Sequence, residues 1–593
     1  MNGSNRPSDP TRPGHPAGPV PPGGPARTEP SPDPASPAAA AGHRPGRARR
    51  ERRPLTWEEV RRRNYVERVK HEKLPFDLLD ELPRLAATHY EDVPEDDILR
   101  LQWWGLYHDK PKVGTFMMRV KIPGGIVTPQ QLRVIGQISQ RFGRNSGEIS
   151  TRQNIQIHWI ELKDVPAIFD LLRQHGLTTA GACGDILRNI TGCPVAGIDA
   201  GELFDTRPYV RALADFFYHN REYSDLPRKH KWTLSACPHQ CNAPEIHDVG
   251  LVGTVVDGRP GFAVLVGGGL STYPRLADPL GVFVPAEDLT AFLQALLDVW
   301  RFDLTYRANR AKARFKFMVE DHGPEAIRRR IEERLGRPLP SLAEVPRPAG
   351  RTGHLGIHPQ KQEGRYYIGF PVFPGLISGE QMVAVADLVE AHGEDVRFTR
   401  EQNLIITGVA AADVDRVVAA MADLGFALDV NPVRGHSIAC TGNPHCNYAV
   451  GDTKPQLVRL VERLEARFGR AVEDLHIHLD GCPHACGQHW VGDIGIQGTT
   501  ARDERGEKIP AYDILLRGGL GPEAAIGRPV ARRVPAGELA GYVERLVGFY
   551  LTRRRPGESP QAFFHRHGDD ELLAVMEGRP GGTPPQAAAG AGD

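Results

Sequence analysis

A repeat that spans most of the chain constrains its fold more than any other feature. The strings PGGIVTPQQL, from Pro123, and PGLISGEQM, from Pro374, resemble one another, and each precedes a helical stretch. A second matched pair follows, TRQNIQI from Thr151 and TREQNLII from Thr399. Apolar residues alternate with a period of two after each Gln-Asn, which predicts a strand. Each unit is therefore predicted as strand, helix and strand.

The repeat extends into two cysteine motifs. Cys237-Pro-His-Gln-Cys241 recurs 245 residues later as Cys482-Pro-His-Ala-Cys486. Four more residues agree at that offset: Asp248, Gly250, Gly253 and Thr254 match Asp493, Gly495, Gly498 and Thr499. We therefore predict an α+β tandem duplication in which two ferredoxin-like modules alternate with two larger halves of a cofactor domain. The cofactor is expected where the halves meet, because pockets commonly form at such interfaces.

The repeat and the composition together suggest seven segments. Residues 1–52 are rich in Pro, Gly and Ala and are expected to be disordered, because they have too few apolar side chains to offset the entropy of ordering. The other expected segments are an N-terminal helical arm (53–110), a first ferredoxin-like module (111–176), a first cofactor-domain half (177–345), a second ferredoxin-like module (352–430), a second half (431–556) and a C-terminal extension disordered at its end (557–593).

Charge and hydropathy exclude several classes of function. Lys plus Arg equals Asp plus Glu, at 73 each, so no overall field indicates a nucleic-acid partner. No uncharged apolar stretch is long enough to predict a membrane span, and the N-terminus has no apolar core of a secretion signal. We expect a cytoplasmic monomer.

Four of the eight cysteines form a constellation in the second half. Cys440-x5-Cys446 is separated by 35 residues from Cys482-x3-Cys486. Four thiolates from two loops can bind an iron–sulfur cluster or zinc, and x5 is wide for a zinc knuckle. From spacing alone a cluster is favoured, while structural zinc and scattered core thiols stay open as alternatives.

The residues around these cysteines resemble a known family. Ala-Cys-Thr-Gly-Asn-Pro-His-Cys-Asn, from Ala439 to Asn447, is similar to the first cysteine motif of the nitrite/sulfite reductases, and Gly-Cys-Pro-His-Ala-Cys-Gly-Gln, from Gly481, to the second. The resemblance covers about Leu101 to Arg555. It implies one [4Fe–4S] cluster bound by Cys440, Cys446, Cys482 and Cys486. It further implies that Cys486 bridges the cluster to the iron of a sirohaem.

The same resemblance implies a set of anion-binding residues. Sirohaem carries eight carboxylates and its substrate is also an anion, so the site needs fixed cations. Taken alone, each cation in the chain is more often a solvated surface residue. The resemblance assigns a catalytic basic set, Arg119, Arg188, Lys229 and Lys231, and a sirohaem-contacting set, Arg152, Gln153, Asn154 and Asn447.

Two substrates remain open, and both take up six electrons. In the family, the position of Lys231 is Lys in typical sulfite reductases and commonly Asn in nitrite reductases, which favours sulfite. The Thr-Gly-Asn stretch after Cys440 and Asp452-Thr-Lys454 resemble nitrite-type relatives instead. Three rival interpretations fit less well: a non-catalytic iron–sulfur sensor, a zinc protein and a relative acting on corrinoid precursors. A sensor would not need the basic set or the duplicated scaffold, a zinc protein would lack haem colour, and the corrinoid branch is expected to depart from the paired-lysine motif.

The remaining cysteines are not explained by the resemblance. Cys183, Cys193, Cys237 and Cys241 echo the cluster set and indicate either a second cluster or a remnant of duplication with packed thiols. A cross-link between Tyr107 and Cys183 is a further hypothesis, because some similar reductases contain one.

The electron donor is expected to be a separate protein. No G-x-G-x-x-G string follows a predicted strand, so no nicotinamide or flavin domain is indicated. The family suggests reduced ferredoxin, an acidic carrier, docking on a basic stretch such as Arg307 to Lys316 or Arg553 to Arg555.

Overall fold

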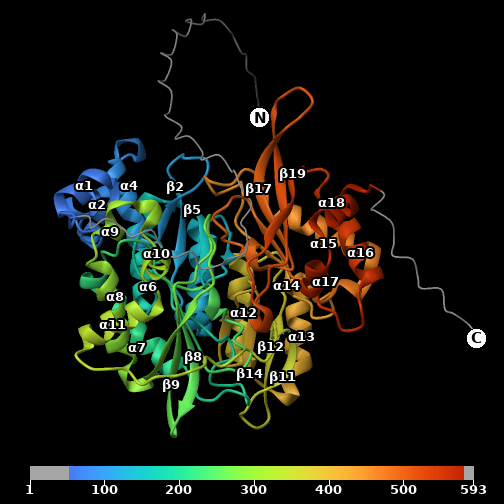
Figure 1. Ribbon diagram of the computed structural model, residues 1–593, viewed down its shortest axis with the longest axis horizontal. Coiled ribbons are helices and arrows are strands. Elements are labelled where there is room, and N and C mark those ends of the chain that lie inside the picture. Colours follow the sequence, from blue (N-terminus) through green and yellow to red (C-terminus); the bar gives the residue numbers. More distant parts are fainter. Residues whose placement is uncertain (1–52, 580–593) are drawn as a thin grey trace, which may run out of the picture. The chain divides into compact units, whose positions relative to one another are not determined.

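The computed structural model describes residues 53–579, and these form four β-sheets in two related pairs (Figure 1). The predicted disordered segments, residues 1–52 and the end of the C-terminal extension (580–593), lie outside the described residues. In the part of the chain that is described, no helix has the length and apolar character needed to cross a membrane.

The first pair of sheets belongs to the two ferredoxin-like modules. One sheet has the order β1 (Leu106–His108), β2 (Thr115–Val120), β5 (Ile155–Glu161) and β4 (Glu148–Ile149). The other repeats this order as β11 (Gly356–Pro359), β12 (Arg365–Phe370), β14 (Leu404–Ala410) and β13 (Val396–Phe398). The predicted duplication is thus present in the strand order itself.

The modules extend each other's sheets. Strand β3 (Ile126–Val127) of the first module pairs antiparallel with β13 of the second, with Val127 opposite Val396. In return, Leu376 of the second module forms a bridge with Glu148 of β4. The two modules also share one hydrophobic core.

Matching helices pack between the modules. Helices α5 (Pro129–Phe142) and α12 (Gly379–His392) each begin with a capping box, Thr128 with Gln131 and Ser378 with Gln381. They approach closely at Gly136, where a Cβ atom would lie 2.7 Å from the carbonyl oxygen of Gly379. A larger residue there would force the helices apart.

The second pair of sheets builds the two larger halves. In the first half the order is β10 (Asp278–Pro285), β9 (Arg259–Val266), β8 (Val249–Val256), β7 (Trp232–Ser235) and β6 (Thr191–Gly192). The second half repeats it with β19 (Arg528–Pro535), β18 (Lys508–Leu516), β17 (Ile494–Arg502), β16 (Ile477–Asp480) and β15 (Ile438–Ala439). In each, the three strands nearest the cysteine loops are parallel and the outer two antiparallel.

The repeated glycines have the same structural reason in both halves. A Cβ at Gly253 would lie 2.5 Å from the Cβ of Ala236, just before Cys237. A Cβ at Gly498 would lie 2.4 Å from the carbonyl oxygen of Gly481, just before Cys482. Glycine lets β8 and β17 pass directly beneath the cysteine loops.

Helices cover these sheets on their outer sides. In the first half α11 (Pro324–Leu335) packs on β10 and on α8 (Leu289–Arg301), and in the second α18 (Asp569–Glu577) packs on β19 and on α16 (Leu539–Arg553) (Figure 1). The other α-helices are α1 (Trp57–Arg63), α2 (Tyr65–Glu72), α3 (Leu78–Ala86), α4 (Glu95–Leu101), α6 (Val165–Gln174), α7 (Arg207–Phe217), α9 (Thr305–Ala308), α10 (Phe315–His322), α13 (Val414–Asp423), α14 (Val433–His436), α15 (Lys454–Phe468) and α17 (Pro560–Arg566).

Candidate active site

The four cysteines of the second half lie on two neighbouring loops. Cys440 directly follows β15, and Cys482 lies two residues after the end of β16. Because β15 and β16 are parallel, with Ala439 opposite Leu479, both loops leave the same edge of the sheet. The loops are bonded to each other: the Gly481 amide donates to Cys440 Sγ (3.2 Å) and the Val450 amide to the Gly481 carbonyl (3.0 Å).

The protein surroundings disfavour bare thiolates on these cysteines. Burial raises the pKa of Cys482 to about 12, and the charges of Cys486, Asp480 and Cys446 add to the effect. Burial, followed by the charge of Asp480, likewise raises the pKa of Cys440 and of Cys486. Bound metal is the group that would stabilise several thiolates on these adjoining loops.

Cys486 also lines a cavity of about 430 Å³ between the two halves. Thr151, which opens the TRQN string, donates its hydroxyl to the Cys486 carbonyl (2.8 Å) and so ties the first ferredoxin-like module to the cysteine loop. The full lining is Thr151, Arg152, Lys229, Lys231, Ile246, His247, Leu270, Ser271, Arg314, His484, Ala485, Cys486 and Gln488. A cysteine and four basic side chains therefore share one space.

Burial affects the charge state of these basic groups. It lowers the pKa of Lys229 to about 7, and the positive charges of Arg228, Arg314 and Arg188 contribute. Burial and the charge of Arg152 also lower the pKa of Lys231 well below its usual value. Among the described residues, Arg152, Lys229 and Lys231 form no ion pair with a carboxylate, so this part of the cavity is built to receive an anion.

Arg152 is placed to hold such an anion. Its Nη1 lies 2.9 Å from His247 Nε2, and its Nη2 donates to the Asn189 carbonyl. Its Nε is buried without a partner among the described residues. Burial lowers the pKa of Arg152 to about 9, with Arg188 contributing. An anionic ligand would satisfy both the orphan donor and the excess charge.

Arg119 and Arg188 lie side by side but do not line this cavity. Both donate to the carbonyl oxygen of Ala182, at 3.1 Å each. Arg119 also contacts Cys183 Sγ (3.3 Å), and Arg188 donates to the Gly184 carbonyl through Nε (3.1 Å) and Nη2 (2.9 Å). The predicted basic set is thus split into a lysine pair at the cavity and an arginine pair that donates to the backbone of residues 182–184.

Three of the predicted cofactor-binding residues form hydrogen bonds with the backbone. Gln153 donates to the carbonyls of Gly192 (3.1 Å) and Phe398 (2.9 Å), although it also lines a smaller cavity of about 280 Å³. Asn154 accepts from the Ile122 amide (3.1 Å), and Asn447 donates to the His108 carbonyl (2.8 Å). Asn154 and Asn447 line neither cavity, so we interpret them as positioning residues.

The pair predicted for a cross-link lies close to the arginine pair. The Tyr107 hydroxyl donates to that of Tyr448 (3.3 Å). Burial raises the pKa of Tyr107, and the charge of Cys183 is among the smaller causes. The two side chains are near enough to interact electrostatically, while the covalent bond itself stays a prediction.

Two cavity residues were missed by sequence reasoning. Arg400 lines the smaller cavity and donates to Gln488 Oε1 (2.6 Å); it is the counterpart of Arg152 in the second TR string, a signal that the repeat contained. Arg314 lines the larger cavity and pairs with Asp248 (2.8 Å). It had been expected on a surface patch.

The predicted surface patch, Arg307 to Lys316, is wrong for three of its five basic residues, which are buried. Arg307 is 3% exposed and pairs with Glu67 (2.9 Å), and Lys316 is 3% exposed and donates to the Leu270 carbonyl (3.0 Å). Arg314 is 7% exposed. Basic residues in a row look alike in sequence whether they meet solvent or buried acceptors.

Comparison with known proteins identifies the family. A model described as the nitrite/sulfite reductase ferredoxin-like half domain matches residues 108–175 and 358–424, and one described as the nitrite and sulphite reductase 4Fe-4S domain matches residues 183–339. An assimilatory ferredoxin-dependent nitrite reductase of Haloferax mediterranei is 34% identical over 84% of this chain and 91% of its own. The chain belongs to the nitrite/sulfite reductase family.

Further relatives of this reductase family fall on both sides of the substrate question. A protein named sulfite reductase [ferredoxin] 1, of Mycolicibacterium paratuberculosis, is also 34% identical, over 86% of this chain and 96% of its own. The solved structure of the Mycobacterium tuberculosis NirA protein superimposes with a TM-score of 0.81 at 32% identity, covering 86% of this chain and 97% of that one. The α+β fold with two ferredoxin-like half domains is thereby confirmed. The protein is an oxidoreductase of the nitrite or sulfite reductase kind.

The residues present fit the cofactors that the family implies. The four thiols of the second half come from two adjoining loops, and the two cavities that share Thr151 and His247 carry five basic side chains: Arg152, Lys229, Lys231, Arg314 and Arg400. Soft sulfur ligands suit iron–sulfur clusters, and a rim of arginine and lysine suits a carboxylate-rich macrocycle.

Proposed function

We propose that this enzyme reduces sulfite to sulfide, with reduced ferredoxin as the electron donor. One [4Fe–4S] cluster would be held by Cys440, Cys446, Cys482 and Cys486, and a sirohaem would be bound through Cys486. The observation that carries the proposal is that Cys486 and two lysines, Lys229 and Lys231, line the same cavity. A sensor or electron carrier has no need of cations aimed at its metal ligand.

The cofactors, when bound, supply single electrons from the cluster to an iron that can bind the substrate. Sulfite needs six electrons and seven protons to become hydrosulfide and three waters. The chain's own residues must therefore supply protons as well as bind an oxyanion. Lys229 and Lys231 can do both, since an ammonium donates a proton and regains it, whereas Arg152 and Arg314 stay charged and orient the anions.

Nitrite is the second candidate, and it has a specific observation in its favour. The relatives named as nitrite and sulfite reductases are equally similar, at 34% identity, and so do not separate the substrates. The Thr441-Gly-Asn443 stretch lies on the cluster loop, where Thr441 Oγ1 donates to Glu148 (2.8 Å). Lys231 favours sulfite, because a lysine beside Lys229 at the cavity attracts the doubly charged sulfite ion more strongly than the singly charged nitrite ion.

The donor would dock outside the buried basic stretch. Arg553 to Arg555, at the end of α16, are exposed, which leaves them as the surface candidate of the two stretches considered. We further propose a cytoplasmic location, where reducing conditions prevent disulfides, since none of the eight cysteines is in a disulfide.

The test is to measure kcat/KM for sulfite and for nitrite with the same chemically reduced ferredoxin. A higher value for sulfite is expected. A higher value for nitrite would replace the substrate and leave the cofactor assignment standing. Turnover of neither anion by an enzyme with full haem absorbance would refute the proposed function.

A further inference from the structure

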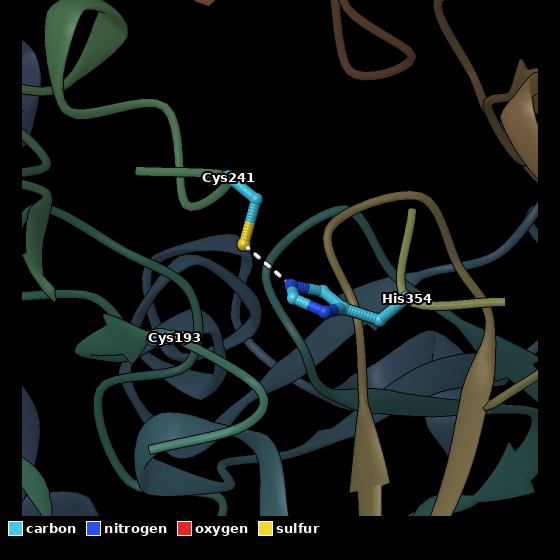
Figure 2. Close-up of side chains that lie close together, drawn as sticks. All are labelled: Cys193, Cys241 and His354. Carbon is cyan, nitrogen blue, oxygen red and sulfur yellow. Dashed lines mark hydrogen bonds between the residues drawn. The ribbon is translucent and has the colours of Figure 1, made fainter. Parts of the chain in front are cut away.

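The cysteines of the first half gather into a cluster that the proposed reaction does not use. Cys193 follows β6, and Cys237 and Cys241 lie on the loop after β7. The side chains of Cys193, Cys237 and Cys241 pack in one cluster. In Figure 2, Cys241 and His354 point toward each other, and Cys241 Sγ lies 3.2 Å from His354 Nε2.

The geometry of this cluster suits a single ion. The Cys193 and Cys241 sulfurs and a ring nitrogen of His354 all lie within 4.8 Å of one another. A tetrahedral zinc ion, with bonds of about 2.3 Å to sulfur and 2.0 Å to nitrogen, places its ligand atoms roughly 4 Å apart. The spacing Cys237-x3-Cys241 also falls within the usual zinc-knuckle range, unlike Cys440-x5-Cys446.

A cubane fits the first-half cluster less well. Among residues 53–579, one other set of three possible metal ligands lies within 4.8 Å: Asp109, His158 and His445. In that set His158 and Asp109 already form an ion pair of 2.9 Å. The second-half cysteines are not so closely gathered. Wider spacing suits a [4Fe–4S] cluster, because each sulfur binds a different iron. The two halves therefore hold their cysteines at different spacings.

The surroundings of the first-half cluster are those of a closed structural site. Cys193, Cys237 and His354 are 2%, 3% and 6% exposed, and Val195, Ile198 and Ile405 belong to the same apolar cluster. His354 presents its Nε2 to Cys241 Sγ at 3.2 Å. Its other nitrogen, Nδ1, lies 3.4 Å from the Tyr367 hydroxyl, the kind of outer contact that orients metal-bound histidines.

His354 is also held in a left-handed backbone conformation, with φ of 54°. Non-glycine residues rarely adopt it, and such strain persists where the surrounding structure requires a particular side-chain position. Here it directs an imidazole from the segment before β11 onto cysteines of the first half.

We propose that Cys193, Cys241 and His354 bind one structural zinc ion, and that Cys237, which packs in the same cluster, completes the site as its fourth ligand. The ion would join three segments: the loop after β6, the loop after β7 and the start of the second ferredoxin-like module. Its ligand Cys241 also lines the smaller cavity, and the Cys241 carbonyl accepts from Arg400 Nε (3.2 Å), so the ion fixes one wall of that cavity. Zinc has no accessible redox change, so the site carries no electrons.

The test uses the full-length holoenzyme after gel filtration in EDTA. Elemental analysis should find about one zinc per chain beside about five irons, one from haem and four from a cubane. Zinc-edge X-ray absorption should show about three sulfurs at ~2.3 Å and one nitrogen at ~2.0 Å. This readout does not depend on which anion the enzyme reduces, so it can fail or succeed independently of the proposed function.

Matched variants sharpen the test. His354→Gln and Cys241→Ser should lose the zinc and keep the iron. His358→Gln is the control, because His358 stacks on the same Tyr367 ring but its Nε2 contacts the Leu355 carbonyl (2.7 Å); it should keep the zinc. If the first two variants do not fold, the absorption spectrum of the unmodified enzyme decides.

Three results would overturn the proposal. The first is the absence of zinc from the unmodified enzyme. The second is about nine irons per chain, the number expected with a second cubane. The third is a zinc ion that has no sulfur ligands.

Discussion

The two larger halves use the same scaffold to hold different chemistry. In the first, the amide of Lys231 donates to Asp248 (2.9 Å), and Asp248 pairs with Arg314 (2.8 Å). In the second, the amide of His476 donates to Asp493 (3.0 Å), and Asp493 pairs with Arg351 (2.8 Å). In both copies the aspartate accepts from the amide of the equivalent residue. The side chain of that residue differs, because it is Lys231 in the first half and His476 in the second.

This difference shows how a duplicated chain can divide one site between its copies. The second half supplies the cysteine that faces the larger cavity, and the first half supplies the two lysines that line it. The conserved features are those that shape the loops, such as Gly253 and Gly498, and the altered ones are side chains that reach the cavity. The following variants compare equivalent positions of the two halves.

The largest effect is expected at the paired cysteine motifs. Cys486→Ser should abolish activity, a loss of more than about 10⁴-fold, and alter both haem and cluster spectra, because this cysteine is the proposed bridge. Its counterpart Cys241→Ser should keep its iron and its haem absorbance. Wild-type spectra and turnover in Cys486→Ser would disprove the bridge.

The paired aspartates should differ in stability. Asp248→Asn leaves Arg314 buried without its charge partner and should lower the free energy of unfolding by about 3–5 kcal/mol. Asp493→Asn should cost less, about 1.5–3 kcal/mol, because Arg351 is 29% exposed and can turn to water. Urea unfolding followed by tryptophan fluorescence measures both.

The contribution of Asp248 also has a defined pH dependence. Burial alone would raise its pKa, but Arg314 and its other positive neighbours lower it below the usual value. A carboxyl with a lowered folded-state pKa stabilises the fold at neutral pH and loses that contribution as the pH falls through this pKa. The gap between wild type and Asp248→Asn should therefore narrow in acid, and a constant gap would contradict the assignment.

Lys229 tests the proton-donating role. Lys229→Met should lower kcat/KM for sulfite about 100-fold, or about 2.7 kcal/mol, with unchanged haem absorbance, since a positioned acid contributes at least that much. Asp474 is the residue of the second half that matches Lys229 in the repeat, and its side chain is exposed. Asp474→Asn should therefore have no effect on kcat/KM. Full activity of Lys229→Met would remove this lysine from the mechanism.

Lys231 should govern substrate choice, with the smallest effect. Lys231→Asn should raise the ratio of kcat/KM for nitrite to that for sulfite about tenfold, or 1.4 kcal/mol, because it removes one cation from the cavity. His476→Asn, at the matching position, should leave the ratio unchanged. The same ratio in Lys231→Asn and wild type would mean that selectivity lies elsewhere.

Local patterns predicted much of this molecule from its sequence. The matched strings at Pro123 and Pro374 predicted two similar modules, and the structure has sheets of the same strand order there. The spacing of Cys440, Cys446, Cys482 and Cys486 predicted loops that meet, and these loops share hydrogen bonds. Such features depend on residues near one another in the chain or on exact repetition.

Features set by long-range packing could not be predicted. Arg314 and Lys316 resemble surface residues until Asp248 and the Leu270 carbonyl are known to accept from them. His354 lies 113 residues after Cys241, with no motif around it. The split of the basic set also depends on the Ala182 carbonyl, which no sequence pattern marks.

The exchange of edge strands between the modules has a consequence for synthesis on the ribosome. Val127 pairs with Val396, so the partner of β3 emerges roughly 270 residues later, about 15 to 50 seconds at ordinary rates of translation. Throughout that interval β3 has no partner strand, and an unpaired edge favours aggregation. The nascent chain should accordingly depend on chaperones until the second module has left the ribosome.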